Sequence, residues 1–495
     1  MGEKIKFGWA EENITPDQKI KLAGQFFERI SEYVETPIAV TALAIESGDS
    51  QMVICSADII HIKPELLKAV REKLEGNVPG LDVKNIILNA THVHTAMLYT
   101  PPEFDSLKSV NTLDVIKEYM QPGQTYKPRV SGEAMDTTEV FFFLVDKIAA
   151  CIKKAWENRK TGCYSNAFGR AVVGHCRRVV YDDGSAKMWG DSNKANFVSL
   201  EGGNDSGIEL IYVFDEKKKL TGVVANIACP AQVVEQRSFI SSDYWGKVRI
   251  LLREKFGEDL FVLGLCSAAG DQCPRDMIRW IEPETPIDDP NVAPRTLERV
   301  GDPSMYDIAG TWKIGKRVAR EIIDVYDEAV ENIKEEEIFA HTVETFEVPL
   351  RRATISEYEE AIYKIKEFFR LTDKTEFNYS DNAHLHVYAG TIIRYEQQQT
   401  ENMVPMELHT ARLGDVAFAT NPFELFLDYG NQIRARSKAK QTILIQLACD
   451  TLGYLPTKKA EEGSHYSAYI SGGVTGHIGG ELLVRKSLER INEKF

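Results

Sequence analysis

Two histidines separated by one residue, His92 and His94, are the side chains of this sequence best suited to chemistry. They follow the short apolar run 86–88, whose length and polar borders predict a buried strand. Side chains two residues apart in an extended segment point the same way, so both imidazoles could reach one cavity. Imidazole binds metals and transfers protons near neutral pH. The pair therefore predicts a metal or catalytic site at a strand end, where open α/β sheets place their ligands.

Three further blocks, far apart in the sequence, place polar residues in tight loops or at predicted strand ends. They are residues 226–232 with 241–244, residues 269–275, and residues 421–424 with 453–457 and Tyr466. Each block alone is consistent with ordinary turn chemistry, because Gly-Asp and Asn-Pro are common turn pairs. Their joint occurrence favours one composite site.

The segments that must position these blocks alternate between strand and helix patterns. Strand-like runs at 39–45, 52–55 and 86–88 surround a helix-like segment at 64–74, and this alternation predicts α/β construction. Further patterns predict helices at 138–156 and 311–333, a helix opened by the capping box Ser356-x-x-Glu359, and strands at 208–214, 222–228, 260–265, 415–420 and 442–448. Proline-containing stretches at 98–137 and 281–305 predict long functional loops. The expected fold class is α/β, with mixed sheets and flanking helices.

The composition indicates a globular protein whose partner is a small molecule. With 59 basic and 74 acidic residues, the net charge of -15 disfavours binding to nucleic acid or to anionic membranes, because both need basic patches. No apolar stretch approaches the roughly 20 residues that a bilayer demands, and residues 1–6 lack the apolar run of a secretory signal. The eight cysteines show no disulfide-framework spacing and no CxxC motif. We expect reduced thiols, a cytoplasmic location and no stable membrane association.

In its combination of blocks the sequence resembles the catalytic domain of the neutral/alkaline (non-lysosomal) ceramidase family over nearly its whole length. The matching blocks, in order, are Ser56-Ala57-Asp58, Thr91-His92-x-His94, Asn226 to Cys229 with Ser241-x-Asp243, Ala269-Gly270 to Pro274, Pro422-x-Glu424, and Tyr454-x-x-Thr457 with Tyr466. The resemblance implies one elaborated catalytic domain over residues 1–495. The family's C-terminal immunoglobulin-like domain is expected to be absent, because the chain stops about 30 residues after Tyr466.

The resemblance also implies a catalytic zinc, which that family holds with two histidines, a glutamate and a tyrosine. By motif, His92 is expected to be the first histidine ligand, Glu424 the carboxylate and Tyr454 the phenolate. A zinc ion with an open position lowers the pKa of a bound water and polarises a carbonyl.

Three more residues receive roles from the same resemblance. His94 is expected beside the metal, as a general acid or base or as a substrate-binding group, and Tyr466 is expected to point at the reacting carbonyl. Arg177, within the run 175–178, would correspond to the arginine of the family's Asn-Arg motif.

The sequence departs from the family's pattern at the second histidine ligand. The run Cys229-Pro230-Ala231-Gln232 stands where that histidine should follow, and no histidine occurs within fifty residues on either side. If a metal is retained, Cys229 is the first expected substitute ligand and Gln232 or Glu235 the next, because thiolate is a normal zinc ligand and a neutral amide is a poor one. The alternative is a buried structural cysteine, with the metal weakened or lost.

A second departure is Cys273, which replaces the serine of the family's Gly-x-x-Ser-Pro loop. Cysteine is the better nucleophile, and a nearby imidazolium or metal lowers its pKa. Alternatively, Cys273 only lines the pocket. The neighbouring residues Gly270, Asp271 and Gln272 are expected to bind substrate, since small residues let backbone N–H groups approach an oxyanion.

We therefore expect a zinc-dependent hydrolase that cleaves an amide (C–N) bond of a small polar substrate through a zinc-bound water. Two other hypotheses stay open. One is a metal-independent thiol hydrolase that uses Cys273 with His94, and the other is a non-catalytic relative that binds a carbohydrate or another small molecule. Kinship at the level of fold does not decide among these chemistries.

Overall fold

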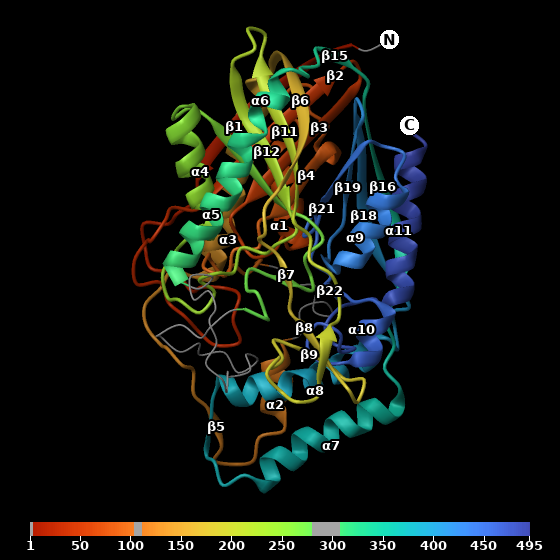
Figure 1. Ribbon diagram of the computed structural model, residues 1–495. Coiled ribbons are helices and arrows are strands. Elements are labelled where there is room, and N and C mark those ends of the chain that lie inside the picture. The colour runs from red at the N-terminus through yellow and green to blue at the C-terminus, as the bar shows by residue number, and fades with distance from the viewer. Residues whose placement is uncertain (1–2, 103–110, 280–306) are drawn as a thin grey trace.

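The computed structural model describes residues 3–102, 111–279 and 307–495, and its largest element is a nine-stranded sheet (Figure 1). The hydrogen-bonded order is β13-β12-β11-β6-β1-β2-β3-β4, and a short strand, β15, pairs with β1. The strands are β1 (Glu3–Asn13), β2 (Ala39–Ser47), β3 (Ser50–Ala57), β4 (Ile86–Ala90), β6 (Lys160–Arg170), β11 (Gly207–Asp215), β12 (Leu220–Ile227), β13 (Phe261–Cys266) and β15 (Glu336–Glu337).

Two pairs of neighbouring strands in this sheet run parallel, and a helix connects each pair. Helix α1 (Pro64–Leu74) joins β3 to β4, and α4 (Asp243–Phe256) joins β12 to β13. In β3, Val53 and Cys55 enter the core beneath the helices, whereas Met52 and Ile54 enter a second core on the opposite face. Its unbroken apolar run is typical of a strand that is covered on both faces.

A second, four-stranded sheet covers the other face of the first one. Its order is β16-β18-β19-β21, with strands β16 (Phe339–Pro349), β18 (Met403–Leu413), β19 (Val416–Thr420) and β21 (Gln441–Ile445). Phe7 and Trp9 of the first sheet share a hydrophobic core with Phe418 and Ile443 of the second. The two sheets are therefore packed face to face around apolar side chains.

Helices cover the outer face of each sheet, which gives four layers (Figure 1). The outer face of the first sheet packs against α1, α3 (Thr137–Glu157), α4 and α5 (Asp307–Asp324). The outer face of the second packs against α9 (Leu427–Arg436), which joins the parallel strands β19 and β21, and against α11 (His477–Asn492).

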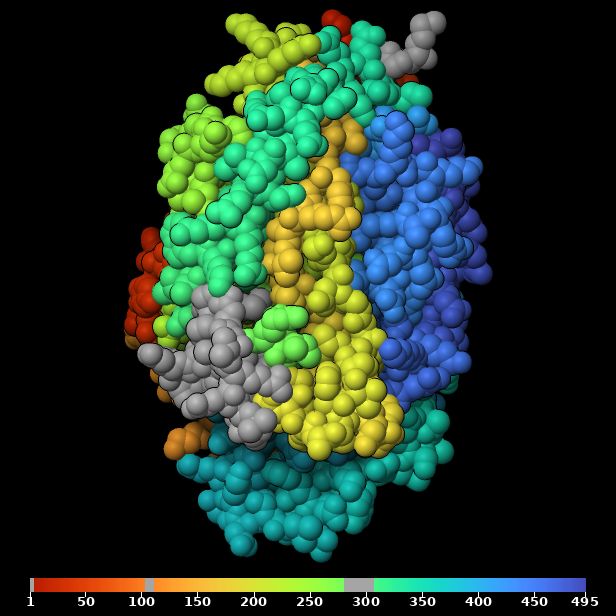
Figure 2. Space-filling model, viewed as in Figure 1, coloured from red at the N-terminus to blue at the C-terminus, as the bar shows by residue number. Residues whose placement is uncertain are grey.

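A separate helical cluster forms the lower end of the molecule in the space-filling view (Figure 2). It contains α2 (Thr112–Glu118), α7 (Ile355–Leu371) and α8 (Tyr379–Gln397), which bury Ile116, Phe369 and Leu385. The remaining elements are short: β5 (Thr125–Tyr126), β7 (His175–Cys176), β8 (Arg178–Tyr181), β9 (Ala186–Met188), β10 (Phe197–Leu200), β14 (Gln272–Cys273), β17 (Glu376–Phe377), β20 (Glu424–Leu425), β22 (Tyr454–Leu455), the 3-10 turn Val83–Asn85, α6 (Tyr326–Val330) and α10 (Lys458–Gly463).

The predicted α/β class, with mixed sheets and flanking helices, is confirmed, but some boundaries differ. The capping box of α7 consists of Thr354 and Glu357, two residues before the predicted pair Ser356 and Glu359. The reason is that Thr354 has the extended backbone that an N-cap needs (φ -77°, ψ 159°). The predicted helix 311–333 is divided into α5 and α6.

The two predicted long loops have different outcomes. In the stretch 98–137, residues 103–110 lie outside the described residues, and the described part contains helix α2 and strand β5. The stretch 281–305 lies outside the described residues. Within the described ranges, no helix combines the length and the apolar character needed to cross a bilayer. All eight cysteines are buried and unpaired, as the absence of a framework spacing predicts.

Candidate active site

The polar blocks singled out in the sequence meet where parallel strands end. From the first sheet, His92 follows β4, the 229–235 loop follows β12 and the 269–275 loop follows β13. From the second sheet, Glu424 follows β19 and Tyr454 follows β21. Loops at the carboxyl ends of parallel strands gather at one edge of a sheet, and here the loops of two packed sheets meet.

The nitrogen of His92 that faces Glu424 is Nε2. The Nδ1 of His92 lies 2.7 Å from the carbonyl oxygen of Ile60, which can only accept a hydrogen bond, so Nδ1 carries the proton. Nε2 lies 3.3 Å from the Glu424 carboxylate. Two buried acceptors at this distance repel each other unless a proton or a cation lies between them. His92 also has a left-handed backbone (φ 63°), which non-glycine residues adopt rarely and often at functional sites.

Two short parallel strands hold Glu424 beside Tyr454. Strands β20 and β22 pair with these two residues in register. Gly270 packs so closely on this strand that a Cβ there would stand 2.2 Å from the carbonyl oxygen of Glu424. Burial raises the pKa of Glu424, but interactions with His92 first and then with Arg177 lower it below its ordinary value. The carboxyl group is therefore ionised near neutral pH, whereas burial and the Glu424 charge raise the pKa of Tyr454.

Arg177 places a buried positive charge beside the same groups. Its Nη2 donates to the Gly270 carbonyl at 3.0 Å and to the Tyr454 hydroxyl at 3.4 Å. Its Nη1 donates to Oε1 of Gln232 at 3.4 Å. Burial lowers the pKa of the guanidinium, but Tyr454 and the acidic groups around it raise that pKa above its ordinary value. Arg177 therefore stays charged, and a fixed cation at this place can stabilise a developing oxyanion.

His94 lies next to His92 and has an unsatisfied ring. The two rings meet edge to face with centres 4.8 Å apart, and Nδ1 of His94 lies 3.4 Å from a Glu235 oxygen. Both ring nitrogens are buried, and neither completes a hydrogen bond with any described residue. Burial lowers the pKa of His94 well below its ordinary value, and His92 lowers it further. The ring is therefore neutral and able to exchange a proton with a ligand.

The sequence did not reveal the residues that hold His94. Gly24, with φ at +98°, lies against the imidazole at a point where a Cβ would stand 2.8 Å from its Cγ. The buried guanidinium of Arg29 donates to the carbonyl oxygens of His94 at 2.7 Å and of Glu235 at 2.5 Å. A glycine in a loop and a single arginine carry no sequence pattern that predicts these roles.

His61 is a third imidazole near the pair and was also not predicted. Burial first, and then Lys63 and His92, lower its pKa to about 3. His61 is therefore neutral, and it adds no positive charge to the surroundings of His92.

Cys229 belongs to the hydrophobic core beneath the helices. Its sulfur lies 3.8 Å from the carbonyl oxygen of Val173 and 3.5 Å from that of Pro230. Burial raises the pKa of the thiol well above its ordinary value. These surroundings fit a structural cysteine better than a zinc-bound thiolate.

The two predicted substitutes for Cys229 lie closer to the site. Gln232 reaches Arg177, and Glu235 reaches His94. The amide nitrogen of Gln232 is buried and has no hydrogen-bond partner in the described part of the chain. A buried donor without a partner is costly, and a polar ligand can satisfy it.

Cys273 packs in a small apolar cluster that also contains Tyr181 and Trp189. Its thiol donates to the carbonyl oxygen of Arg275 at 3.2 Å. Burial raises the pKa of Cys273 to about 12, although Arg177 lowers it. The residue is therefore a protonated thiol near neutral pH, as expected of a side chain that lines the site.

The loop residues predicted to bind substrate are engaged within the protein. Gly270 N–H donates to the carbonyl of Leu425 at 2.8 Å, and Gln272 N–H donates to that of Ala269 at 3.0 Å. An Asp271 carboxylate oxygen accepts from Leu427 N–H at 2.9 Å. The backbone of this loop therefore positions Arg177 and Glu424, which both contact it.

Tyr466 lies at the edge of the site. Its ring meets that of Tyr454 in an edge-to-face contact with centres 5.6 Å apart, and that of Phe26 at 5.7 Å. The backbone carbonyl of Tyr466 accepts from Nη1 of the buried Arg178 at 3.0 Å. This anchor fixes the loop from which the Tyr466 ring projects.

The residues at this site fit a zinc ion. His92, Glu424 and Tyr454 offer an imidazole nitrogen, an ionised carboxylate and a phenol oxygen, and all three are donors that zinc accepts. Nε2 of His92 and the Glu424 carboxylate lie 3.3 Å apart, so a proton or a cation has to lie between them.

The sequence matches no family model and no curated protein, whereas solved structures match its fold. The chain superposes on the neutral ceramidase from Pseudomonas aeruginosa with a TM-score of 0.65 and 15% identity, over 99% of this chain and 74% of that one. A structure of a ceramidase complexed with C2 gives a TM-score of 0.65 and 13% identity, over 99% and 75% of the two chains. The resemblance expected from the sequence blocks is confirmed at the level of fold.

Proposed function

We propose that the protein is a metal-dependent hydrolase that cleaves an amide (C–N) bond of a small polar substrate, with zinc held by His92, Glu424 and Tyr454. The observation that carries this proposal is the 3.3 Å approach of Nε2 of His92 to the ionised Glu424 in a buried site, where a proton or a cation has to lie between them. The fold shared with neutral ceramidase supports the reaction class by analogy.

Three protein ligands are sufficient for this role. Catalytic zinc sites commonly use three side chains and leave the remaining position to water or substrate. The surroundings of Cys229 favour a structural role, so we do not include it among the ligands. When bound, the zinc would lower the pKa of a coordinated water towards neutrality and polarise the substrate carbonyl.

His94 is the proposed proton carrier. It takes the proton that the attacking water loses and returns it to the nitrogen of the leaving amine. Because Nδ1 faces Glu235, the exchanging atom is Nε2. Glu235 is then a positioning residue, which orients the ring and stabilises the imidazolium that forms.

Arg177 and Tyr466 are proposed to act on the substrate carbonyl. The guanidinium is held in place by the Gly270 carbonyl and the Tyr454 hydroxyl, so its charge is fixed before the oxyanion develops. The substrate is proposed to be polar because Arg177, Glu235 and the unpartnered amide nitrogen of Gln232 all lie here.

Metal content and amidase activity together test the proposal. Purified protein is assayed for amine release from a panel of N-acyl amino acids and small amides, before and after chelation and after zinc is restored. Glu424→Gln is expected to lose one equivalent of zinc and to reduce kcat/KM by about a thousandfold. Glu462→Gln removes the same charge from an exposed side chain and serves as the matched control.

Two results would contradict the proposal. Full activity in metal-free protein would exclude the zinc mechanism. Binding of panel compounds without turnover of any would favour the non-catalytic alternative.

A further inference from the structure

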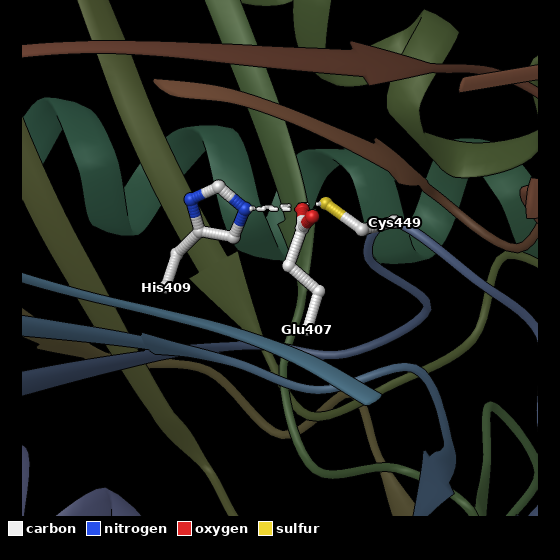
Figure 3. Close-up of side chains that lie close together, drawn as sticks. All are labelled: Glu407, His409 and Cys449. Carbon is white, nitrogen blue, oxygen red and sulfur yellow. Dashed lines mark hydrogen bonds and ion pairs between the residues drawn. The ribbon is translucent and has the colours of Figure 1, made fainter. Parts of the chain in front are cut away.

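Three potential metal ligands converge at a second place, where the two sheets meet (Figure 3). Glu407 and His409 lie two residues apart on β18, so their side chains project from the same face of the strand. Cys449 follows β21, and its N–H donates to the carbonyl of Leu88 on β4 at 2.8 Å. One ligand atom from each residue lies within 4.8 Å of the others. None of the three belongs to the candidate active site.

A chain of hydrogen bonds determines which nitrogen of His409 carries a proton. The carbonyl of Gln51 can only accept, so Nδ1 of His341, 2.9 Å away, carries a proton. In a neutral ring, Nε2 of His341 then accepts from Nδ1 of His409 at 3.1 Å. The chain leaves a bare lone pair on Nε2 of a neutral His409.

That lone pair points at two further donor atoms. Nε2 of His409 lies 2.7 Å from a Glu407 oxygen and 3.6 Å from the sulfur of Cys449. Two ligands on a tetrahedral zinc, with Zn–S of about 2.3 Å and Zn–N of about 2.0 Å, stand about 3.5 Å apart. The nitrogen and the sulfur therefore already have nearly this separation, and only the Glu407 oxygen has to move outward by a fraction of an ångström.

Arg71 holds the Glu407 carboxylate in place but does not occupy all of the lone pairs of its two oxygens. Its two terminal nitrogens donate to the two Glu407 oxygens at 2.9 and 2.7 Å. An ionised carboxylate has about four lone-pair positions, so Glu407 can still bind an ion. A divalent cation bound here displaces the thiol proton of Cys449, and the charges of Glu407 and of the Cys449 thiolate then balance the two positive charges of the ion.

The cluster is also accessible from outside. Arg71, Glu407 and Cys449 line a surface pocket of about 350 Å³. His409 is only 1% exposed and lies beneath it. An ion bound to the three side chains would therefore face the pocket with its remaining position.

We propose that Glu407, His409 and Cys449 form a second divalent-metal site, selective for zinc, with an open coordination position towards the pocket. The donors are one oxygen, one nitrogen and one sulfur, a set that suits zinc and does not suit the oxygen-seeking Mg²⁺ or Ca²⁺. His341 is the outer-sphere partner that fixes the ring of His409, as such partners commonly do in zinc sites. The site shares no ligand with the proposed active site, so either can exist without the other.

Cobalt substitution tests this site through its sulfur ligand. Metal-free protein is titrated with Co²⁺ alone, and the near-ultraviolet thiolate-to-cobalt charge-transfer band is recorded together with the number of protons released. The wild-type chain is expected to show the band and to release about one proton per ion at this site, from the thiol of Cys449. Cys449→Ser is expected to abolish the band and remove one bound metal, whereas Glu424→Gln is expected to keep the band.

Cys229→Ser is the matched control, because it changes another buried thiol and is expected to keep the band. His341→Gln leaves all three ligands in place and is expected to weaken cobalt binding about 10- to 100-fold. The absence of a band in wild-type protein, or its persistence in Cys449→Ser, would overturn the proposal. A band lost in Cys229→Ser and not in Cys449→Ser would assign the sulfur ligand to the active-site region instead.

Discussion

The backbone of Gly24 lies directly on the imidazole of His94, so that a Cβ at residue 24 would stand 2.8 Å from the Cγ of that ring. No L side chain fits there without displacing the ring, and the φ of +98° is a second obstacle. This contact, with the Arg29 hydrogen bond to the His94 carbonyl, helps to fix the position of the proposed proton carrier.

Gly24→Ala is therefore expected to impair catalysis more than stability. A displacement of about 1 Å at a catalytic group costs about a hundredfold in rate, and kcat/KM measures that loss. Gly123→Ala is the matched control, because Gly123 has a similar φ of +91° and no atom within 4 Å of its added Cβ. Both variants should lose about 1–3 kcal/mol of unfolding free energy through backbone strain. An equal loss of activity in the two variants would contradict this role of Gly24.

Arg177 and Arg178 are neighbours with different expected roles, and lysine substitutions should separate them. Arg177→Lys keeps the charge but removes the fork that contacts Gly270 and Tyr454, so kcat/KM is expected to fall about 100- to 1000-fold. Arg178→Lys breaks a buried bidentate pair with Glu201 and is expected to lose about 3 kcal/mol of unfolding free energy. Denaturant titration and steady-state kinetics on both variants measure these effects. A loss of stability in Arg177→Lys together with a loss of activity in Arg178→Lys would refute the assigned roles.

Cys273 is expected to be dispensable for turnover. Because burial raises the pKa of its thiol to about 12, little thiolate exists near neutral pH. Cys273→Ser should retain most of the activity, and iodoacetamide should not inactivate the native protein. Loss of activity in this variant together with resistance to chelators would instead support the thiol-hydrolase hypothesis.

His465 should make the protein less stable in acid. Burial first, and then the charges of Lys187 and Arg178, lower its pKa to about 4, whereas the unfolded chain has a histidine pKa of about 6.5. Between these two pH values the unfolded chain binds a proton that the folded chain does not. The contribution of His465 is therefore fully present above about pH 6.5 and is lost as the pH falls towards 4.

Urea unfolding at several pH values measures this effect. His465→Asn keeps an acceptor for the Met188 N–H and is expected to flatten the slope of unfolding free energy by up to about 1.4 kcal/mol per pH unit. The exposed His384, changed in the same way, is the control. An unchanged slope in His465→Asn would show that the buried imidazole does not titrate as expected.

The sequence predicted those parts of the fold that depend on local pattern. Helix α1 begins and ends where its amphipathic pattern does, and the strand before His92 is β4. The α7 boundary was wrong by two residues, because both Thr354 and Ser356 fit a capping pattern and only the backbone conformation distinguishes them. Local patterns therefore locate elements better than their ends.

Features that depend on tertiary packing could not be predicted. Cys229 was the first choice for the missing ligand, yet its sulfur points into the core, and its orientation depends on how β12 ends. The contact between His341 and His409 arises because β16 and β18 pair with one particular register. Neither orientation nor register is visible in a single sequence, because each is determined by the residues that pack around it.

The two-sheet architecture has a consequence for synthesis on the ribosome. His92 emerges early, whereas Glu424 and Tyr454 emerge after most of the chain, together with the strands that cover Phe7 and Trp9. Until then a nascent chain exposes one apolar sheet face and leaves its half of the proposed metal site open to water. Contacts this distant in sequence form slowly, and exposed apolar faces promote aggregation. The nascent protein is therefore expected to depend on chaperones until its last third has been made.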